Sequence, residues 1–251
     1  RDYYASRGLG DVYKRQMEKN NTIQSAEIQS GVHSVILAKD VIPDGQMKVD
    51  MAMHAEMDMQ DTTDLKYLAQ IASSILGQDS YSQVFYTDGY YYVDTNGVKL
   101  KYPMPLEQII SSVQTGVTTS NMESSYMKGI SLNEVNGKRV LAYEANPKKL
   151  NKNVKEALGT VMNTLGTDVN LDMNIQEMKG AYVLDDNDYI IYMTNYIVYN
   201  MEVLDQPMTC ITLMETEVQN PGEPVVVTLP STDGYEDLIG LYDGVIESEV
   251  E

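Results

Sequence analysis

Apolar and polar residues alternate most clearly between positions 49 and 60. The apolar set is Val49, Met51, Met53, Ala55, Met57 and Met59, and five of the six residues interleaved with them are polar. Successive side chains of a β-strand point to opposite faces of its sheet, so a period of two places the apolar set on one face. A helix would scatter the same residues around its axis. This segment is therefore predicted to be a long strand that buries one face.

Tight-turn signals separate short strand-like runs elsewhere in the chain. Asp-Gly and Asn-Gly pairs between β-prone runs are the strongest short-range signals of a hairpin, and Pro-Asp-Gly and Asp-Asp-Asn also mark chain reversals. These turns fall at 43–45, 88–89, 96–97, 136–137 and 185–187. They predict strand meanders over residues 81–102 and 169–229, with a hairpin over 126–145 between them.

Helical spacing, with apolar residues three or four positions apart, occurs in a few segments. The predicted helices cover residues 17–30, 62–76, 106–113 and 147–166. The chain therefore reads as helices interrupted by two antiparallel meanders. This order favours an α+β domain over the strict β–α alternation of a parallel sheet.

The first 16 residues differ from the rest of the chain. The string RDYYASRGLGDVYKRQ has no apolar period and no helix-capping pattern. It resembles translated sequencing-adapter read-through at the start of genes from metagenomic assemblies; the alternative is a disordered, mildly basic arm. We expect residues 1–16 to be non-native and unfolded, with the true start of the gene missing. The folded domain is expected over 17–230, and residues 231–251 to form an acidic, solvated tail.

Composition excludes several classes of function. The chain has 37 Asp and Glu against 18 Lys and Arg, a net charge of -19. Such a charge repels phosphate backbones and anionic lipids, so we expect neither nucleic-acid binding nor electrostatic membrane binding. One Cys and two His leave little material for a disulfide framework, a zinc site or His-based catalysis. We expect no enzyme activity, no cofactor and no metal, and no segment approaches the ~20 apolar residues of a transmembrane helix.

Three features could suggest chemistry. His54 stands among acidic residues on the polar side of the alternating segment, as in a loose metal site, although a carboxylate row facing water is commoner. Residues 185–188 (Asp-Asp-Asn-Asp) resemble a calcium loop in composition, but they lack its Gly and its bidentate Glu, so a hairpin turn is the better interpretation. Cys210 lies mid-strand without a CxxC partner and is expected to be a small buried residue.

Three segments in order resemble a known group of proteins. They are TDGYYYVDTNGVKLKYPMP at 87–105, VNGKRVLAYEANP at 135–147 and the strand at 224–230. Uncharacterised Gram-positive cell-surface lipoproteins carry similar hairpins in this order, and they look related to the LolA/LppX-like lipoprotein-carrier fold. The resemblance implies an α+β domain, a strongly curved antiparallel sheet (half-barrel) with helices packed over a concave face that can hold acyl chains.

The same resemblance implies a cellular location. Members of that group are extracytoplasmic lipoproteins, with a signal peptide and an acylated cysteine that would lie upstream of residue 17. Contact with a membrane would then occur only through a lipid anchor that is absent from this sequence.

Methionine and tyrosine are the unusual part of the composition, with 16 Met and 19 Tyr against one Phe and no Trp. Methionine can fill irregular gaps between a curved sheet and its helices. Alternatively, Met and Tyr side chains can line a soft apolar cavity for a lipid-like ligand. The predicted lining consists of Met51, Met53, Met57, Met59, Tyr86, Tyr92, Met173 and Met193.

Two functions remain open at this point. The first is a monomeric, non-enzymatic extracytoplasmic lipoprotein domain that binds or carries an apolar or amphiphilic ligand. The alternative is a cell-surface interaction module with a fully packed core, whose acidic surface meets a basic protein partner. A cavity of roughly 300 Å³ or more beneath the helices would favour the first.

Overall fold

The computed structural model describes residues 2–20, 22–39, 41–61, 63–110, 124–152, 173–203 and 206–238. Within them are the helix α1 (Asp2–Asn20), helical turns at 106–110 and 147–152, and short 3-10 turns at Pro43–Gly45 and Ser124–Tyr126. The strands are β1 (Ser25–Leu37), β2 (Gln46–Asp58), β3 (Lys66–Ile75), β4 (Gln78–Thr87), β5 (Tyr90–Thr95), β6 (Val98–Pro103), β7 (Met127–Val135), β8 (Lys138–Ala145), β9 (Met173–Leu184), β10 (Ile190–Val203), β11 (Gln206–Gln219) and β12 (Glu236–Asp237).

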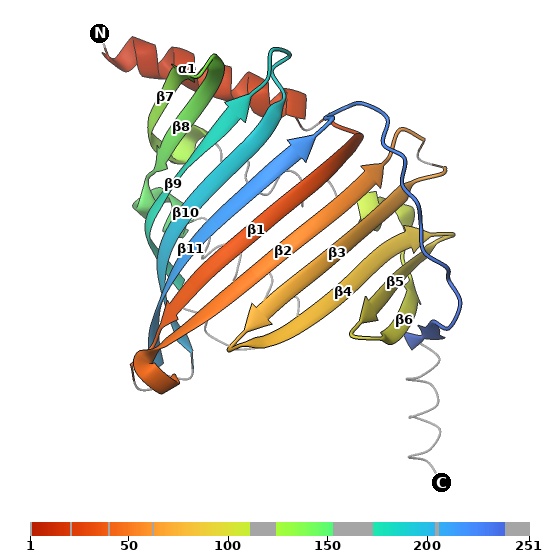
Figure 1. Ribbon diagram of the computed structural model, residues 1–251. Helices are drawn as coiled ribbons and strands as arrows, with labels where there is room; N and C mark the ends of the chain where they lie inside the picture. Colours follow the sequence, from red (N-terminus) through yellow and green to blue (C-terminus); the bar gives the residue numbers. More distant parts are fainter. Residues whose placement is uncertain are drawn as a thin grey trace.

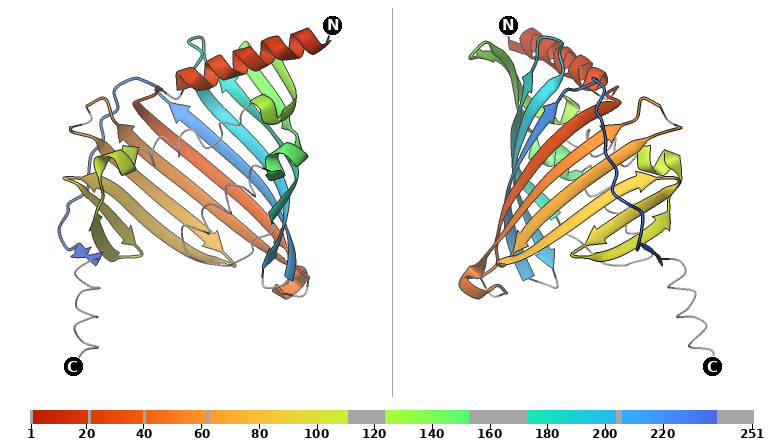
Figure 2. Two further views of the ribbon diagram at one scale, coloured as in Figure 1. Left: turned by 180° about the vertical axis from the view of Figure 1, so that it is seen from behind. Right: turned by 45° about the vertical axis from the view of Figure 1, so that its right-hand side comes forward.

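All the described strands belong to one sheet, in the order β12-β6-β5-β4-β3-β2-β1-β11-β10-β9-β8-β7 (Figure 1). Every neighbouring pair is antiparallel except β12 and β6. The sheet is strongly curved and stays open, with a convex face turned towards the viewer in Figure 1 and a concave face seen from behind in Figure 2. The antiparallel, curved sheet of the predicted fold is therefore confirmed.

The turn signals and the alternating segment predicted most of their strands correctly, but the strand expected at residues 224–230 is wrong, because this segment pairs with no neighbour as a strand. The alternating segment forms β2, and both hairpins over residues 81–102 are present. At the second hairpin Asn96 and Gly97 have φ of 50° and 86°. Positive φ at both positions defines the type I′ turn that Asn-Gly favours.

Two of the predicted helices are wrong, because residues 62–76 contribute strand β3 and residues 25–37 form strand β1. Strand β3 is hydrogen-bonded on both sides, to β2 and β4. Tyr67 and Ala69 face the core on the concave side, as does Ile71 opposite Met53, whereas Leu68 packs against a cluster on the convex side. Apolar residues on both faces of a strand produce spacings of three and four that imitate a helix.

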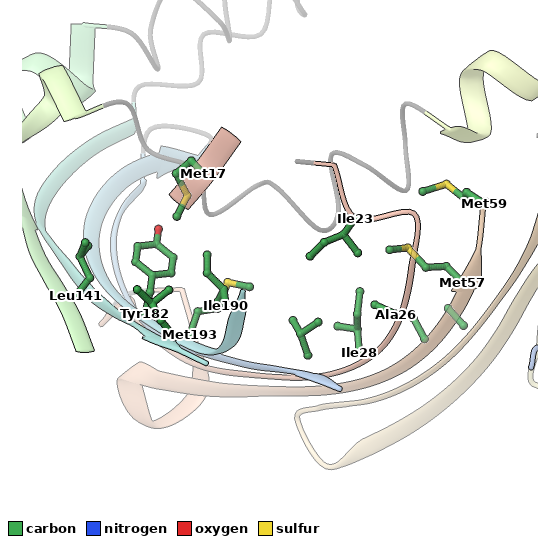
Figure 3. Close-up of a cluster of buried hydrophobic side chains, with 14 of the residues drawn as sticks. Met17, Ile23, Ala26, Ile28, Met57, Met59, Leu141, Tyr182, Ile190 and Met193 are labelled. Carbon is green, nitrogen blue, oxygen red and sulfur yellow. The ribbon is translucent and has the colours of Figure 1, made fainter. Parts of the chain in front are cut away.

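The main core lies on the concave face, as Figure 3 shows. Its buried side chains come from α1, from the strands and from Ile109 in the helical turn at 106–110. The predicted helices over 106–113 and 147–166 extend beyond the described residues, so their packing over the concave face stays a prediction.

A smaller cluster lies on the convex face. Phe85 and Tyr92 stack there with ring centroids 4.6 Å apart, and Tyr235 meets both rings edge-on. The segment after β11 crosses the convex face to reach this cluster, and β12 then pairs with the edge strand β6 (Figure 1). Within the expected solvated tail, residues 231–234 are exposed, whereas Tyr235 is buried and Glu236–Asp237 form β12; residues 239–251 lie outside the described part of the chain.

The expectation that residues 1–16 are unfolded also needs correction. Residues 2–16 form most of α1, and Tyr13 is 2% exposed in the concave core, with its ring 5.9 Å from that of Tyr182. The helix ends at Asn20, so the helix predicted over 17–30 is present only in its first turn. The resemblance of the segment to adapter sequence stays an interpretation of its origin.

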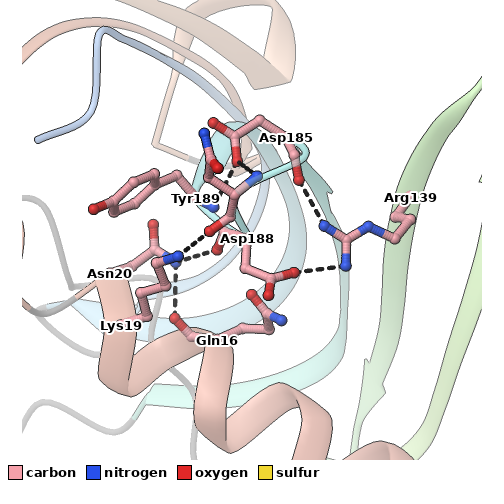
Figure 4. Close-up of polar contacts among 8 residues, drawn as sticks. Gln16, Lys19, Asn20, Arg139, Asp185, Asp188 and Tyr189 are labelled. Carbon is pink, nitrogen blue, oxygen red and sulfur yellow. Dashed lines mark hydrogen bonds and ion pairs between the residues drawn. The ribbon is translucent and has the colours of Figure 1, made fainter. Parts of the chain in front are cut away.

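The end of α1 is fastened to the turn between β9 and β10 (Figure 4). The Asn20 side-chain oxygen accepts a hydrogen bond from the backbone N–H of Ile190 at 2.8 Å, and its amide nitrogen donates to the carbonyl of Gln16 at 2.7 Å. Lys19 donates to the carbonyl of Asn187 and lies over the ring of Tyr189. Helix and turn are thus joined by the buried hydrogen bond of Asn20 to Ile190 and by the exposed contacts of Lys19.

Replacing Asn20 by alanine is expected to lower the free energy of unfolding by about 1–3 kcal/mol, because the buried N–H of Ile190 loses its acceptor. Asn187→Ala, at an exposed position of the same turn, should cost a few tenths of a kcal/mol. Urea denaturation of the two variants measures the difference. Equal stabilities would contradict this attachment of α1.

Candidate ligand-binding face

The strand register assigns each side chain to a face, because directly opposed residues on neighbouring strands point to the same side. Met53 on β2 lies opposite Ser30 on β1 and Ile71 on β3. Ser30 in turn lies opposite Thr216 on β11, and Thr216 lies opposite Met193 on β10. This row belongs to the concave face, since Met193 is part of the concave core.

The structure brings seven of the eight predicted lining residues to this face. Met57, Met59, Tyr86 and Met193 are buried in the core, and Met53 packs against them half-buried. Met51 is the most open of the set, and Met173 is half-buried on β9, opposite Met201.

Tyr92 is the exception. It stacks on Phe85 in the convex cluster, so it lies on the opposite side of the sheet from the other seven residues. It therefore cannot line the same surface.

The concave face has a packed zone near α1 and a more open zone towards the far ends of β1 and β2. In the open zone Val32 lies opposite Met51 on one side and Met214 on the other. Val32 and Met214 are half-buried, Met51 is 40% exposed, and Ile75 one row further is 45% exposed. Apolar side chains thus continue beyond the packed core.

Hydroxyl groups between these apolar residues pair with one another across strands. Ser30 and Thr216 lie 2.9 Å apart through their oxygens, and Ser34 and Thr212 are also 2.9 Å apart. A hydroxyl that is hydrogen-bonded to a neighbouring side chain costs less when an apolar ligand removes it from water. The open zone therefore suits apolar contact despite its Ser and Thr content.

A buried tyrosine group borders the packed zone. The ring centroids of Tyr143 and Tyr182 are 5.5 Å apart, and the Tyr143 hydroxyl donates to the side-chain oxygen of Asn195. Burial raises the pKa of both phenols well above the usual value, because the charged form would lie out of contact with water. Gly180 leaves room for the Tyr143 hydroxyl, since a Cβ at this position would lie 2.7 Å from the Tyr143 oxygen.

The residues considered for other chemistry have structural partners. His54 lies 2.9 Å from Glu27 and His33 lies 2.7 Å from Asp50, each in a single pair. No group of three or more His, Cys, Asp and Glu in the described residues could hold a metal ion. Cys210 is buried on β11.

The Asp-rich segment at 185–188 is the hairpin turn that was predicted. The Asp185 carboxylate accepts hydrogen bonds from the backbone N–H of Asn187 at 2.8 Å and of Tyr189 at 2.9 Å. Its carboxylate is therefore used to hold the turn.

Residues 8–230 match DUF6612, a family of unknown function. The chain belongs to the DUF6612 family. No curated protein shows significant similarity to this DUF6612 member.

Several solved structures are similar at low identity. LprF from Mycobacterium bovis is 10% identical, with a TM-score of 0.38 over 90% of this chain and 98% of LprF. Lipoprotein LppX from Mycobacterium tuberculosis is 9% identical, with a TM-score of 0.38 over 88% of this chain and 99% of LppX. The ywiB protein from Bacillus subtilis reaches a TM-score of 0.27 at 12% identity, over 80% of this chain and 96% of ywiB.

Two hollows of about 490 and 470 Å³ in the DUF6612 domain lie mainly between convex-face side chains. They share Ala52, Ala72 and Tyr81, so they adjoin each other. Sequence reasoning missed them, because their residues come together only through the register of six strands. No helix in the described part of the chain is long and apolar enough to span a membrane.

Proposed function

We propose that this domain binds an apolar or amphiphilic, lipid-like ligand on the concave face and performs no catalysis. The observation that carries the proposal is the open zone of that face. There, apolar side chains extend beyond the packed core and are substantially exposed to solvent. Met51 and Ile75 are the most exposed of them. Large exposed apolar surfaces on a folded domain often mark binding sites.

The chemistry of the face supports a flexible, chain-like ligand. Met51, Met53 and Met214 are unbranched and adaptable, and such side chains can follow the changing shape of an acyl chain. The paired hydroxyls of Ser30–Thr216 and Ser34–Thr212 leave few unsatisfied polar groups to be desolvated.

The test is saturable binding of a fluorescent fatty acid to the purified, monomeric chain, at about one probe per protein. Each additional buried methylene contributes about 0.8 kcal/mol, so affinity should rise about fourfold per methylene. The salt concentration should change this affinity little, since the contacts between the fatty acid and the protein are apolar. A folded protein that shows no saturable binding at any chain length overturns the proposal.

Ser73 and Ser74 offer matched variants, because adjacent residues of β3 face opposite sides. Ser73 lies opposite Met51 on the concave face, and Ser74 lies opposite Asp50 on the convex face. Ser73→Phe should weaken fatty-acid binding by roughly tenfold through lost space, whereas Ser74→Phe should leave it unchanged. If the two variants changed the fatty-acid affinity equally, the probe would not bind on the concave face.

We also propose an extracytoplasmic location, as a lipoprotein whose anchor precedes the domain. The hairpin at 87–105 and the segment at 135–147 support it through their resemblance to surface lipoproteins. Labelling the full-length gene product with a palmitate analogue in its host tests this, and a product that stays unlabelled in the cytosol contradicts it.

A further inference from the structure

The two hollows on the convex face form one groove that crosses the strands. Its floor is a row of cross-strand neighbours, Gly31 on β1, Ala52 on β2 and Ala72 on β3. The row ends at Glu215 on β11, opposite Gly31, and at Tyr81 on β4, opposite Ala72. The glycine and the two alanines have little or no side chain, whereas Glu215 and Tyr81 at the ends of the row are large, so the middle of the groove stays open.

Two parallel rows of polar side chains form the walls. Gln29, His54 and Gln70 oppose one another along one side, with Glu217 at the β11 end. Gln70 donates to Gln83 at 3.2 Å, which extends this wall to β4. Amide side chains in a row can donate to and accept from the backbone of an extended peptide.

The second wall is acidic. His33 and Asp50 oppose each other on β1 and β2, and Ser74 and Asp79 continue the row on β3 and β4. The pairing of His33 with Asp50 at 2.7 Å fixes the carboxylate on this wall.

Aromatic rings stand at both ends of the groove. Tyr81 is 46% exposed, and its backbone N–H is held by the Asn96 side chain at 2.8 Å. Tyr192 donates its hydroxyl to Glu215 at 2.6 Å at the other end. Exposed aromatic faces beside carboxylates favour ammonium and guanidinium groups.

Apart from His33 and His54, the charged side chains that line the groove are all carboxylates. Asp50, Asp79, Glu215 and Glu217 line the hollows, and no described residue lining either hollow is a Lys or an Arg. From β11 to β4 the groove crosses four strand spacings, about 19 Å, which matches roughly six residues of extended chain.

We propose that this groove binds an extended, Lys- or Arg-rich segment of a partner protein. The amide wall contacts the backbone of the segment, the carboxylates pair with its cationic side chains, and Tyr81 and Tyr192 pack against their stems. The site lies on the opposite face from the fatty-acid zone and does not depend on it.

The experiment is fluorescence anisotropy of the full chain with a labelled six-residue peptide that alternates lysine and serine. The lysine peptide should bind saturably at low salt, and its affinity should fall as the salt concentration rises. Peptides with glutamate or glutamine in place of lysine should not bind. Absence of binding by the lysine peptide, or equal binding of the glutamine peptide, overturns the proposal.

A matched pair of variants locates the site. Ala72→Lys places a cation on the exposed floor of the groove and should lower the affinity for the lysine peptide by roughly tenfold. Asn133→Lys adds the same charge at an exposed position of β7, outside the groove, and should change affinity little. Both should bind the fatty-acid probe as the unaltered protein does, so failure here is separable from failure of the proposed function. Equal weakening by both variants, or none by Ala72→Lys, overturns the groove as the site.

Discussion

Met57→Asp is expected to abolish the stable fold, whereas Met51→Asp, six residues earlier on the same face of β2, should leave the protein folded. Met57 is 1% exposed and Met51 is 40% exposed. Losing a buried Met side chain costs about 2–5 kcal/mol, and burying an unpaired carboxylate costs several more. The sum rivals the 5–15 kcal/mol stability of a typical domain.

Circular dichroism with urea titration measures this contrast in stability. Met51→Asp adds a functional readout, because the carboxylate would enter the open zone of the concave face. It should reduce fatty-acid affinity by roughly tenfold or more while the melting curve shifts little. A folded Met57→Asp variant would mean that β2 does not bury this face.

The faces of a strand could be predicted where one face is apolar and the other is polar. Strand β2 satisfies this condition, and its proposed lining residues Met51, Met53 and Met57 therefore share one face. Strand β3 does not, because Leu68 meets the convex cluster while Tyr67 and Ala69 face the core. With apolar residues on both sides, the sequence period no longer distinguishes strand from helix.

Tyr92 shows a second limit. It follows Tyr90 and Tyr91, so three consecutive tyrosines hide the alternation of faces. Its burial depends on Tyr235, which arrives from a segment more than 140 positions away. The residues next to Tyr92 in the sequence give no information about this distant contact with Tyr235.

The convex groove depends on long-range register in the same way. Gly31 lies opposite Glu215 because β1 pairs with β11, and opposite Ala52 because β1 pairs with β2. A shift of one residue in either pairing would move these side chains to the other face. The single residues were visible in the sequence, but their common row was not.

Gly180→Ala is expected to destabilise the protein by roughly 3 kcal/mol, near the upper end for an overpacked core. A Cβ at this position of β9 would lie 2.5 Å from the backbone oxygen of Thr194 and 2.6 Å from the side-chain oxygen of Asn195. The Thr194 oxygen belongs to the neighbouring strand β10, so it cannot move without distorting the sheet. The Tyr143 hydroxyl, which donates to Asn195, would also be displaced.

Gly129→Ala on β7 is the matched control, because a Cβ there meets no atom within 4 Å. Neither glycine has a positive φ that would penalise alanine. Gly129→Ala should therefore leave stability unchanged or raise it by a few tenths of a kcal/mol, through lower entropy of the unfolded chain. Thermal unfolding compares the two. If both variants melt alike, the close approach of β9 and β10 at Gly180, and the tyrosine group that depends on it, would be wrong.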